Sequence, residues 1–399
     1  LVGQPPRRER VGAEPRVAKL FRGGLLVPPE AVTPALLERM AADLGGWLAR
    51  NTAEDGTLPY KWWPSRGAEA TGDNALRRCM ATLWLNRWAW HSGDPVARAA
   101  ADRNLRRNLR VLYVEDAGRG YIDDSGQTKL GAAAFAATAI RESPLRAELA
   151  ETLAKLDAGI AFLWNEDGSF RTFHRPVERD RENQNFYPGE ALVYLGLVQR
   201  ETGDPALLAK ALRSLAWYRD WHLANRNPAF VPWHSQAATL FLAASGEAWL
   251  RDWIFAMNDW LLAMQQAAVP HPDLLGRFYD PAHPEYGSPH ASSTGVYLEG
   301  LADAWMLAEA AGDQARVERY GQAIRLGLRS IRQLQFRDED LVPYRQPERL
   351  AGGVRTEVYD NGLRVDNVQH ALGACLKLIA QPRFMAWLGS RPSAPPATP

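Results

Sequence analysis

Two kinds of helical segment alternate along almost the whole chain. Six segments are apolar on nearly every side, and six others have one apolar and one charged face. The apolar segments span residues 74–91, 129–141, 188–202, 235–245, 293–311 and 367–380, and the amphipathic ones span residues 34–50, 95–114, 144–164, 205–224, 247–266 and 313–335. A helix that is apolar all round must be buried, whereas a helix with one charged face lies at the surface. The alternation therefore predicts six inner helices surrounded by six outer ones.

This double layer favours a closed ring. We expect an all-α fold, the (α/α)6 barrel or six-hairpin toroid, with long loops and short β-hairpins on one face. An open helical solenoid, in which each helix pair packs only on its neighbours, is the alternative. The count stops at six pairs, and Asp366-Asn367 at the last inner segment repeats Asp73-Asn74 at the first. Both observations favour closure.

Short turns join each apolar segment to the amphipathic segment that follows it. In Gly93-Asp94-Pro95 the glycine ends one helix, the aspartate caps the next, and the proline occupies its first turn. Similar signals stand at Ser143-Pro144, Gly203-Asp204-Pro205, Gly246-Glu247 and Gly312-Asp313. We expect an N-terminal arm over residues 1–32, the barrel over 33–385 and a flexible C-terminal tail over 386–399.

The connections that lead from an amphipathic segment to the next apolar one are long. Several contain hairpin-like strings: GTLPYKWWPSR, RGYIDDSGQTK and GSFRTFHRP. The stretch 352–364 also predicts a hairpin, with its turn at Asn361-Gly362, and Asp366 is the expected N-cap of the helix that follows. All these loops emerge on the face where the inner helices begin. Because long loops in compact domains are usually functional, the site is expected on that face.

Composition excludes several classes of function. The 399 residues carry a formal net charge of +1, which argues against a nucleic-acid partner. No run of about 18 apolar residues predicts a transmembrane helix, and the first residues lack the apolar core of a signal peptide. Cys79 and Cys375 both fall inside apolar segments, which predicts buried thiols and fits a reducing compartment. We therefore expect a cytoplasmic protein, although a native leader before Leu1 stays an open alternative. The oligomeric state is not indicated.

Polar and aromatic residues gather at the predicted starts of the inner helices. The expected catalytic residues are Glu190, Asp366, His234, His370 and Asp73. The expected substrate-binding residues are Arg77, Trp62, Trp63, Tyr187, Gln236, His290, Glu299, Arg364 and Gln369. Aromatic faces take up the apolar face of a sugar ring, while charged and amide groups hydrogen-bond its hydroxyls. Histidines without metal-ligand spacing and only two cysteines predict no metal site, and we expect no cofactor.

With this rhythm of segments, the chain resembles the (α/α)6-toroid carbohydrate enzymes. These include six-hairpin glycosidases, the N-acylglucosamine 2-epimerase family, some polysaccharide lyases and uronyl epimerases. The resemblance covers nearly the whole chain and concerns architecture. It implies a carbohydrate-active enzyme whose substrate is an oligo- or polysaccharide.

The expected function is a glycoside hydrolase that acts on an anionic, uronate-containing oligo- or polysaccharide by paired-carboxylate catalysis, and two alternatives stay open. In a glycoside hydrolase, Glu190 would be the general acid and Asp366 or Asp73 the base or nucleophile. Apolar neighbours of Glu190 are expected to raise the pKa of its carboxyl. In a sugar epimerase, isomerase or lyase, His234 and His370 would move a proton while Arg77 stabilises an enolate. The other alternative is a non-catalytic glycan-binding toroid.

Each candidate also has a structural interpretation. Glu190 and Asp366 are also the kind of acid that favours the first turn of a helix. Arg77 and Asp366 are expected to form an ion pair where the ring closes. Arginines and lysines near the expected site (Lys61, Arg77, Arg78, Lys129, Arg171, Arg175, Arg355 and Arg364) suggest an anionic, uronate-containing substrate. Solvated loop charges are the alternative explanation for them.

Overall fold

The computed structural model describes residues 20–391, and its long helices form two layers. The outer helices are α1 (Pro34–Asn51), α3 (Pro95–Leu112), α5 (Ala150–Phe162), α7 (Pro205–Ala224), α9 (Ala248–Leu262) and α11 (Gln314–Leu334). The inner helices are α2 (Ala75–Ser92), α4 (Leu130–Arg141), α6 (Tyr187–Thr202), α8 (Phe230–Ser245), α10 (Ala291–Ala310) and α13 (Val365–Ile379). The short helices α12 (Pro347–Leu350) and α14 (Pro382–Gly389) complete the set in this part of the chain.

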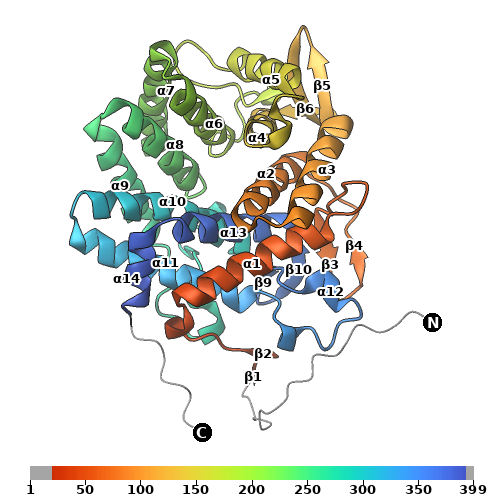
Figure 1. Ribbon diagram of the computed structural model, residues 1–399. Helices are drawn as coiled ribbons and strands as arrows, with labels where there is room; N and C mark the ends of the chain where they lie inside the picture. Colours follow the sequence, from red (N-terminus) through yellow and green to blue (C-terminus); the bar gives the residue numbers. More distant parts are fainter. Residues whose placement is uncertain (1–19, 392–399) are drawn as a thin grey trace.

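The inner helices form a closed ring. Each contacts the next in the order α2, α4, α6, α8, α10 and α13, and α13 contacts α2. Where the ring closes, α1 lies along α13, so the two ends of the barrel sequence are side by side (Figure 1). The predicted (α/α)6 barrel is confirmed, and the open solenoid is excluded.

Most of the short β-strands lie in the loops that precede inner helices. Two strands, β1 (Leu20–Phe21) and β2 (Gly24–Leu25), form a hairpin within the expected N-terminal arm, whose residues 1–19 lie outside the described part. One four-stranded sheet has the order β4 (Ala68–Glu69), β3 (Lys61–Trp63), β10 (Asp360–Arg364), β9 (Arg355–Glu357). The other has the order β5 (Tyr113–Asp116), β6 (Arg119–Asp124), β7 (Gln127–Lys129), β8 (Phe173–Arg175). The β3–β10 pairing joins the loops before the first and last inner helices, so it fastens the ring where the chain must close.

The predicted helix boundaries are largely confirmed. Thr33 caps α1, and its side chain accepts a hydrogen bond from the Leu36 amide. Asp94 and Asp204 cap α3 and α7 in the same way. Gly93 has φ 65°, in the left-handed region that glycine adopts without steric cost. The turn chemistry of the sequence therefore sets where most hairpins of the ring reverse.

Three predicted helices have clearly different bounds, one of them the segment 247–266, where α9 ends at Leu262. The segment 144–164 is not one helix, because the backbone at Leu149 (φ −98°, ψ 17°) leaves the helical region and α5 starts after it. Inner helix α8 starts at Phe230 and not at residue 235, since Pro232 is tolerated in its first turn. The expected flexible tail is helical over residues 386–389, as part of α14, and residues 392–399 lie outside the described part.

The hairpin at residues 352–364 has a different turn from the predicted one. Asp360 pairs with Glu357, so the turn lies at residues 358–359 and Asn361-Gly362 belongs to an irregular part of β10. The strand then runs directly into α13, whose N-cap is Arg364. Asp366 is therefore not the N-cap. Its carboxylate pairs with two arginines, and a charge-assisted pair is stronger than a cap to a backbone amide.

Two simpler expectations concern the interior and the membrane. Cys79 and Cys375 are buried free thiols, as the sequence predicts. Within residues 20–391, no helix is both long and apolar enough to cross a membrane.

Candidate active site

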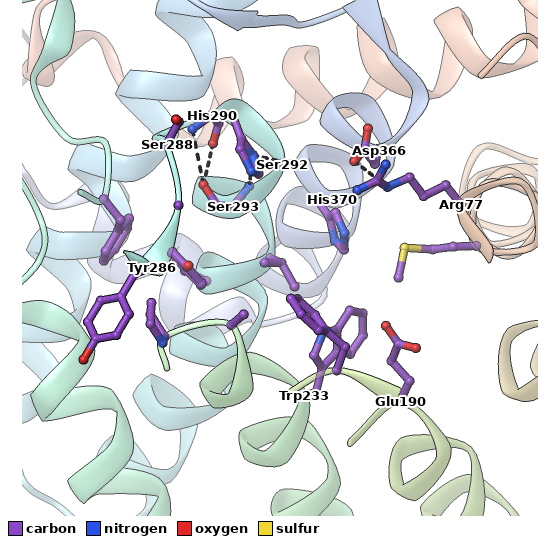
Figure 2. Close-up of a pocket in the computed structure, with 18 of the residues that line it drawn as sticks. Arg77, Glu190, Trp233, Tyr286, Ser288, His290, Ser292, Ser293, Asp366 and His370 are labelled. Carbon is purple, nitrogen blue, oxygen red and sulfur yellow. Dashed lines mark hydrogen bonds and ion pairs between the residues drawn. The ribbon is translucent and has the colours of Figure 1, made fainter. Parts of the chain in front are cut away.

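A cavity of about 310 Å³ opens at the face where the inner helices begin. Residues from α2, α6, α8, α10 and α13 line it, together with the loop over residues 278–290. Of the expected site residues, the cavity wall includes Arg77, Tyr187, Glu190, His290, Asp366, Gln369 and His370. Glu190 and Trp233 project toward it from one side, and His370, Arg77 and Asp366 lie on another (Figure 2).

Asp366 is held between two guanidinium groups. Its Oδ2 lies 2.9 Å from Arg77 Nε, and its Oδ1 accepts a 2.9 Å hydrogen bond from Arg364 Nε. Arg364 Nη2 donates to Oδ2 as well. Although burial alone raises the pKa of Asp366, the two arginines outweigh it and lower the pKa to about 2. The carboxylate is thus ionised at neutral pH and both its oxygens are engaged.

His370 and Glu299 form a second polar pair, in the next turn of α13. His370 Nδ1 lies 2.8 Å from Glu299 Oε1, and Glu299 on α10 is almost fully buried. A carboxylate at this distance holds the proton on Nδ1 and leaves Nε2 as the proton acceptor. The imidazole also lies 5.9 Å from the Trp233 ring, measured between centroids. Glu299 therefore fixes the orientation of the His370 imidazole on the cavity wall.

Glu190 has the opposite surroundings. It lies in the first turn of α6, and its Oε2 is buried without a hydrogen-bond partner. Burial raises the pKa of Glu190 to about 8, and the charge of Arg77 opposes the rise only in part. The carboxyl is therefore mostly protonated at pH 7. This agrees with the pKa direction expected from its apolar neighbours.

A glycine on the adjacent inner helix makes room for this carboxyl. A Cβ on Gly131 of α4 would lie 1.8 Å from Glu190 Oε2. Glycine within a helix costs roughly 1 kcal/mol relative to alanine, so it needs a compensating reason. Here the reason is that the Glu190 side chain, which extends from α6, lies close against the backbone of α4.

His290 caps α10 and remains neutral. Its Nδ1 accepts a 3.0 Å hydrogen bond from the Ser293 amide and lies 2.8 Å from Ser292 Oγ. Burial lowers the pKa of His290 to about 4, and the charge of Arg364 contributes. Because Nδ1 is an acceptor, the ring proton sits on Nε2. His290 is thus a hydrogen-bond donor in the cavity wall.

Several expected site residues lie elsewhere. Asp73 is exposed and pairs with Arg78, and neither lines the cavity. His234 is fully buried behind the wall, stacked on Phe230 at 3.5 Å between ring centroids, and burial lowers its pKa. His234 therefore has no access to a substrate in the cavity.

Trp62 and Trp63 are half-buried in β3 and contact Arg349 and Lys61 rather than the cavity. Trp62 also packs against the hydrophobic core, so core packing and cation–π contacts account for these two tryptophans.

The remaining expected site residues lie in the cavity wall or behind it. Glu299 and Arg364 hold His370 and Asp366 without lining the cavity themselves. Gln369 lines it, and its amide Nε2 lies 2.7 Å from Met80 Sδ. Gln236 lines a second, smaller cavity.

Several aromatic residues of the cavity wall were not among the expected site residues. Trp233, Phe186, Phe278, Tyr279, Tyr286 and Tyr297 all line the cavity beside Tyr187. Tyr297 stands four residues after Ser293 on α10, so helical periodicity from the loop face was a usable signal. The aromatic residues of the 278–286 loop had no such signal. Within the described residues, no group of three or more His, Cys, Asp or Glu side chains is arranged to hold a metal ion.

Comparisons with known proteins agree with the fold. No protein-family model matches the chain, and neither does any curated protein sequence. Among solved structures, a D-mannose isomerase superimposes with a TM-score of 0.64 at 13% identity, covering 89% of this chain and 99% of that one. An α-1,6-mannanase from Salegentibacter sp. HEL1_6 gives a TM-score of 0.60 at 10% identity over 88% of this chain and 99% of that one.

A third similar structure is the unsaturated glucuronyl hydrolase from Bacillus sp. GL1, responsible for the degradation of glycosaminoglycan. It gives a TM-score of 0.59 at 17% identity, covering 86% of this chain and 96% of that one. At these identities the likeness concerns the fold. The chain has the (α/α)6 toroid fold that these carbohydrate-active enzymes share.

Proposed function

We propose that this protein is a carbohydrate-active enzyme that transfers protons on a bound sugar, as an isomerase or epimerase does. One observation carries the proposal: an oriented imidazole, His370, and a protonated carboxyl, Glu190, line the same cavity. Isomerisation and epimerisation need a base that accepts a proton from carbon at about pH 7. They also need an acid that is still protonated at that pH to give one to oxygen. The D-mannose isomerase among the similar structures supports the same choice.

Each group has a role that follows from its surroundings. His370 accepts a proton at Nε2 because Glu299 holds the other ring nitrogen. Glu190 donates its proton to a sugar oxygen, since its raised pKa keeps it neutral until the reaction. Arg77 lines the same cavity and would stabilise the negative charge of an enolate oxygen, and its pair with Asp366 keeps it fixed.

The cavity wall favours a neutral sugar. Among the described lining residues, Arg77 is the one Lys or Arg side chain, and Asp366 already compensates its charge. Lys129 pairs with Asp124, Arg175 with Asp116, and both lie outside the wall. A uronate carboxylate would therefore meet a single guanidinium in the wall, whose charge Asp366 already offsets. The aromatic wall and a volume of about 310 Å³ suit the apolar face of one or two sugar rings.

Glycoside hydrolysis is the second candidate. A specific observation favours it: Glu190 and Asp366 are two carboxyls on one cavity whose pKa values are pushed in opposite directions, to about 8 and about 2. That is the protonation pattern of an acid and a nucleophile or base. It ranks second because Arg77 and Arg364 occupy both oxygens of Asp366, which weakens it as a base.

Product analysis in deuterated water separates the two. The purified protein is incubated with neutral hexoses, N-acylhexosamines and uronates, and separately with neutral and uronate-containing oligosaccharides. Proton transfer predicts deuterium at carbon and an isomeric sugar, seen by NMR, without new reducing ends. New reducing ends without deuterium at carbon would instead establish hydrolysis. Neither product, with saturable sugar binding, would indicate the non-catalytic glycan-binding alternative.

A further inference from the structure

A second cavity lies one turn deeper along the inner helices, next to the candidate active site. Its volume is about 20 Å³. Met80, Glu190 and Trp233 border both cavities. Arg87, Gln236 and Glu299 line only the small one. The small cavity is therefore the space directly behind the proposed acid.

Two residues that line this space carry a buried polar atom without a partner. Glu190 Oε2 and Gln236 Nε2 are both buried and make no hydrogen bond with the protein. Glu299 borders the same cavity, and its Oε1 lies 2.8 Å from His370 Nδ1. A buried water needs roughly 10–15 Å³ and two to four polar partners. The cavity meets both conditions for a single molecule.

We propose that this cavity holds one water molecule that links Glu190 to Glu299, and that Gln236 positions it. The neutral Glu190 carboxyl donates to the water oxygen, Gln236 Nε2 donates to it as well, and the water donates to the Glu299 carboxylate. The site of the water does not depend on the reaction; its catalytic meaning rests on the proposed function.

The orientation of the Gln236 amide follows from a cation beside it. Lys377 Nζ lies 3.1 Å from Gln236 Oε1, 2.6 Å from Asp303 Oδ2 and 3.1 Å from the Glu299 carbonyl oxygen. An ammonium group only donates, so the oxygen of the amide must face it. The NH2 group of Gln236 is thereby directed away from Lys377 and is available to the water.

The link lets Glu190 change its protonation state inside the protein. While Glu190 is neutral, it donates to the water. Once Glu190 has given its proton to a sugar oxygen, the water donates one hydrogen to the Glu190 carboxylate and the other to Glu299, and no O–H bond of the water breaks. Both groups return to their starting states in the second half of the reaction, when a sugar oxygen gives a proton back to Glu190 and His370 returns one from Nε2 to carbon.

A crystal structure at high resolution tests the site directly, in the unmodified protein. We expect one ordered water within hydrogen-bond distance of Glu190 Oε2, Gln236 Nε2 and Glu299. An empty cavity at a resolution where other buried waters are seen would overturn the proposal.

Substitution tests whether Gln236 positions the water. The Glu190 carboxyl is titrated by its infrared band, assigned by subtracting the matching Glu190→Gln protein. In Gln236→Leu we expect the pKa of Glu190 to rise by about one unit, because the ionised carboxylate loses a water that donates to it, and that bond is stronger than the one made by the neutral carboxyl. Gln236→Asn, which keeps an amide, should restore part of the shift.

The matched control is Gln199→Leu, which removes a buried amide of α6 that lines neither cavity. Equal titration of Glu190 in wild type, Gln236→Leu and Gln199→Leu would contradict a positioning role. If Gln236→Leu fails to fold, the Gln236→Asn titration and the wild-type water density decide the matter. None of these measurements requires turnover, so they are independent of the product analysis above.

Discussion

The two walls of the candidate active site shift the pKa of a carboxyl group in opposite directions. On the wall formed by α2 and α13, Asp366 is surrounded by arginines and stays ionised. On the wall formed by α6, Glu190 meets apolar groups and the Gly131 backbone and stays protonated. Both residues lie in the first turn of an inner helix, where the helix dipole favours negative charge. The difference shows that local partners and burial, rather than helix position, decide the protonation state.

The largest expected effect concerns the proposed base, His370, on the same wall as Asp366. His370→Asn should lower turnover by roughly 10²- to 10⁴-fold on any sugar that shows deuterium exchange, since a positioned base contributes about that much. Steady-state kinetics measure the change, and circular dichroism checks the fold. His234→Asn is the matched control, because His234 is buried outside the cavity. A greater loss of turnover in His234→Asn would contradict the assignment.

The second-largest effect concerns the free energy of unfolding at pH 8, which Glu190→Gln should raise. The pKa of Glu190 is raised in the folded protein from 4.5 to about 8. Its contribution to stability is therefore complete below about pH 4.5 and is lost as the pH rises through about 8. Glu190→Gln should be more stable than wild type at pH 8, by up to about 5 kcal/mol, with the gain vanishing toward pH 4. Urea unfolding across this pH range measures it.

Asp366→Asn should instead lower the free energy of unfolding at neutral pH. The pKa of Asp366 is lowered to about 2, so its contribution is present above about pH 4 and is lost as the pH falls through 2. Removing the carboxylate leaves Arg77 and Arg364 unpaired and should cost about 2–3 kcal/mol at pH 7. The double variant Asp366→Asn with Arg77→Met should recover part of this loss. If both acid-to-amide changes shift stability in the same direction, the contrast between the walls is wrong.

A smaller effect tests the packing behind Glu190. Gly131→Ala places a Cβ 1.8 Å from Glu190 Oε2, so the carboxyl or α4 must move. We expect a loss of about 1–3 kcal/mol, as for other overpacked interiors, and a lower pKa of Glu190 if it moves toward water. Gly46→Ala on α1 is the control, because its Cβ would meet only the flexible end of Arg50 at 3.0 Å. That change should be neutral or stabilising by helix propensity.

The smallest effect concerns Asp73, a catalytic candidate on sequence grounds. Its carboxylate is exposed and pairs with Arg78 at 2.8 Å. Asp73→Asn should change stability by less than about 1 kcal/mol and leave turnover unchanged. Steady-state kinetics beside Asp366→Asn provide the comparison. A tenfold loss of turnover would mean that Asp73 reaches the substrate in the complex.

Part of the candidate site was predictable from the sequence. Glu190, Asp366 and His370 stand at the starts of apolar segments, and such segments must be inner helices, so their first turns meet at one end of a ring. The Arg77–Asp366 pair was expected for the same reason and is present at 2.9 Å. His234 shows the limit of this reasoning. A one-turn error in the start of α8 turned a residue on the buried side of the helix into an apparent cavity residue.

The sequence by itself determined the alternation of inner and outer helices, the short turns between them and the end of the barrel where polar residues gather. Those features depend on periodicity and on the chemistry of caps and turns, which act over a few residues. The tertiary structure decided which side chains meet: Glu299 with His370, Gly131 with Glu190, and Lys377 with Gln236. These partners are separated by 59 to 141 residues, and their contact depends on the rotation of each helix about its axis, which is fixed only when the ring is packed.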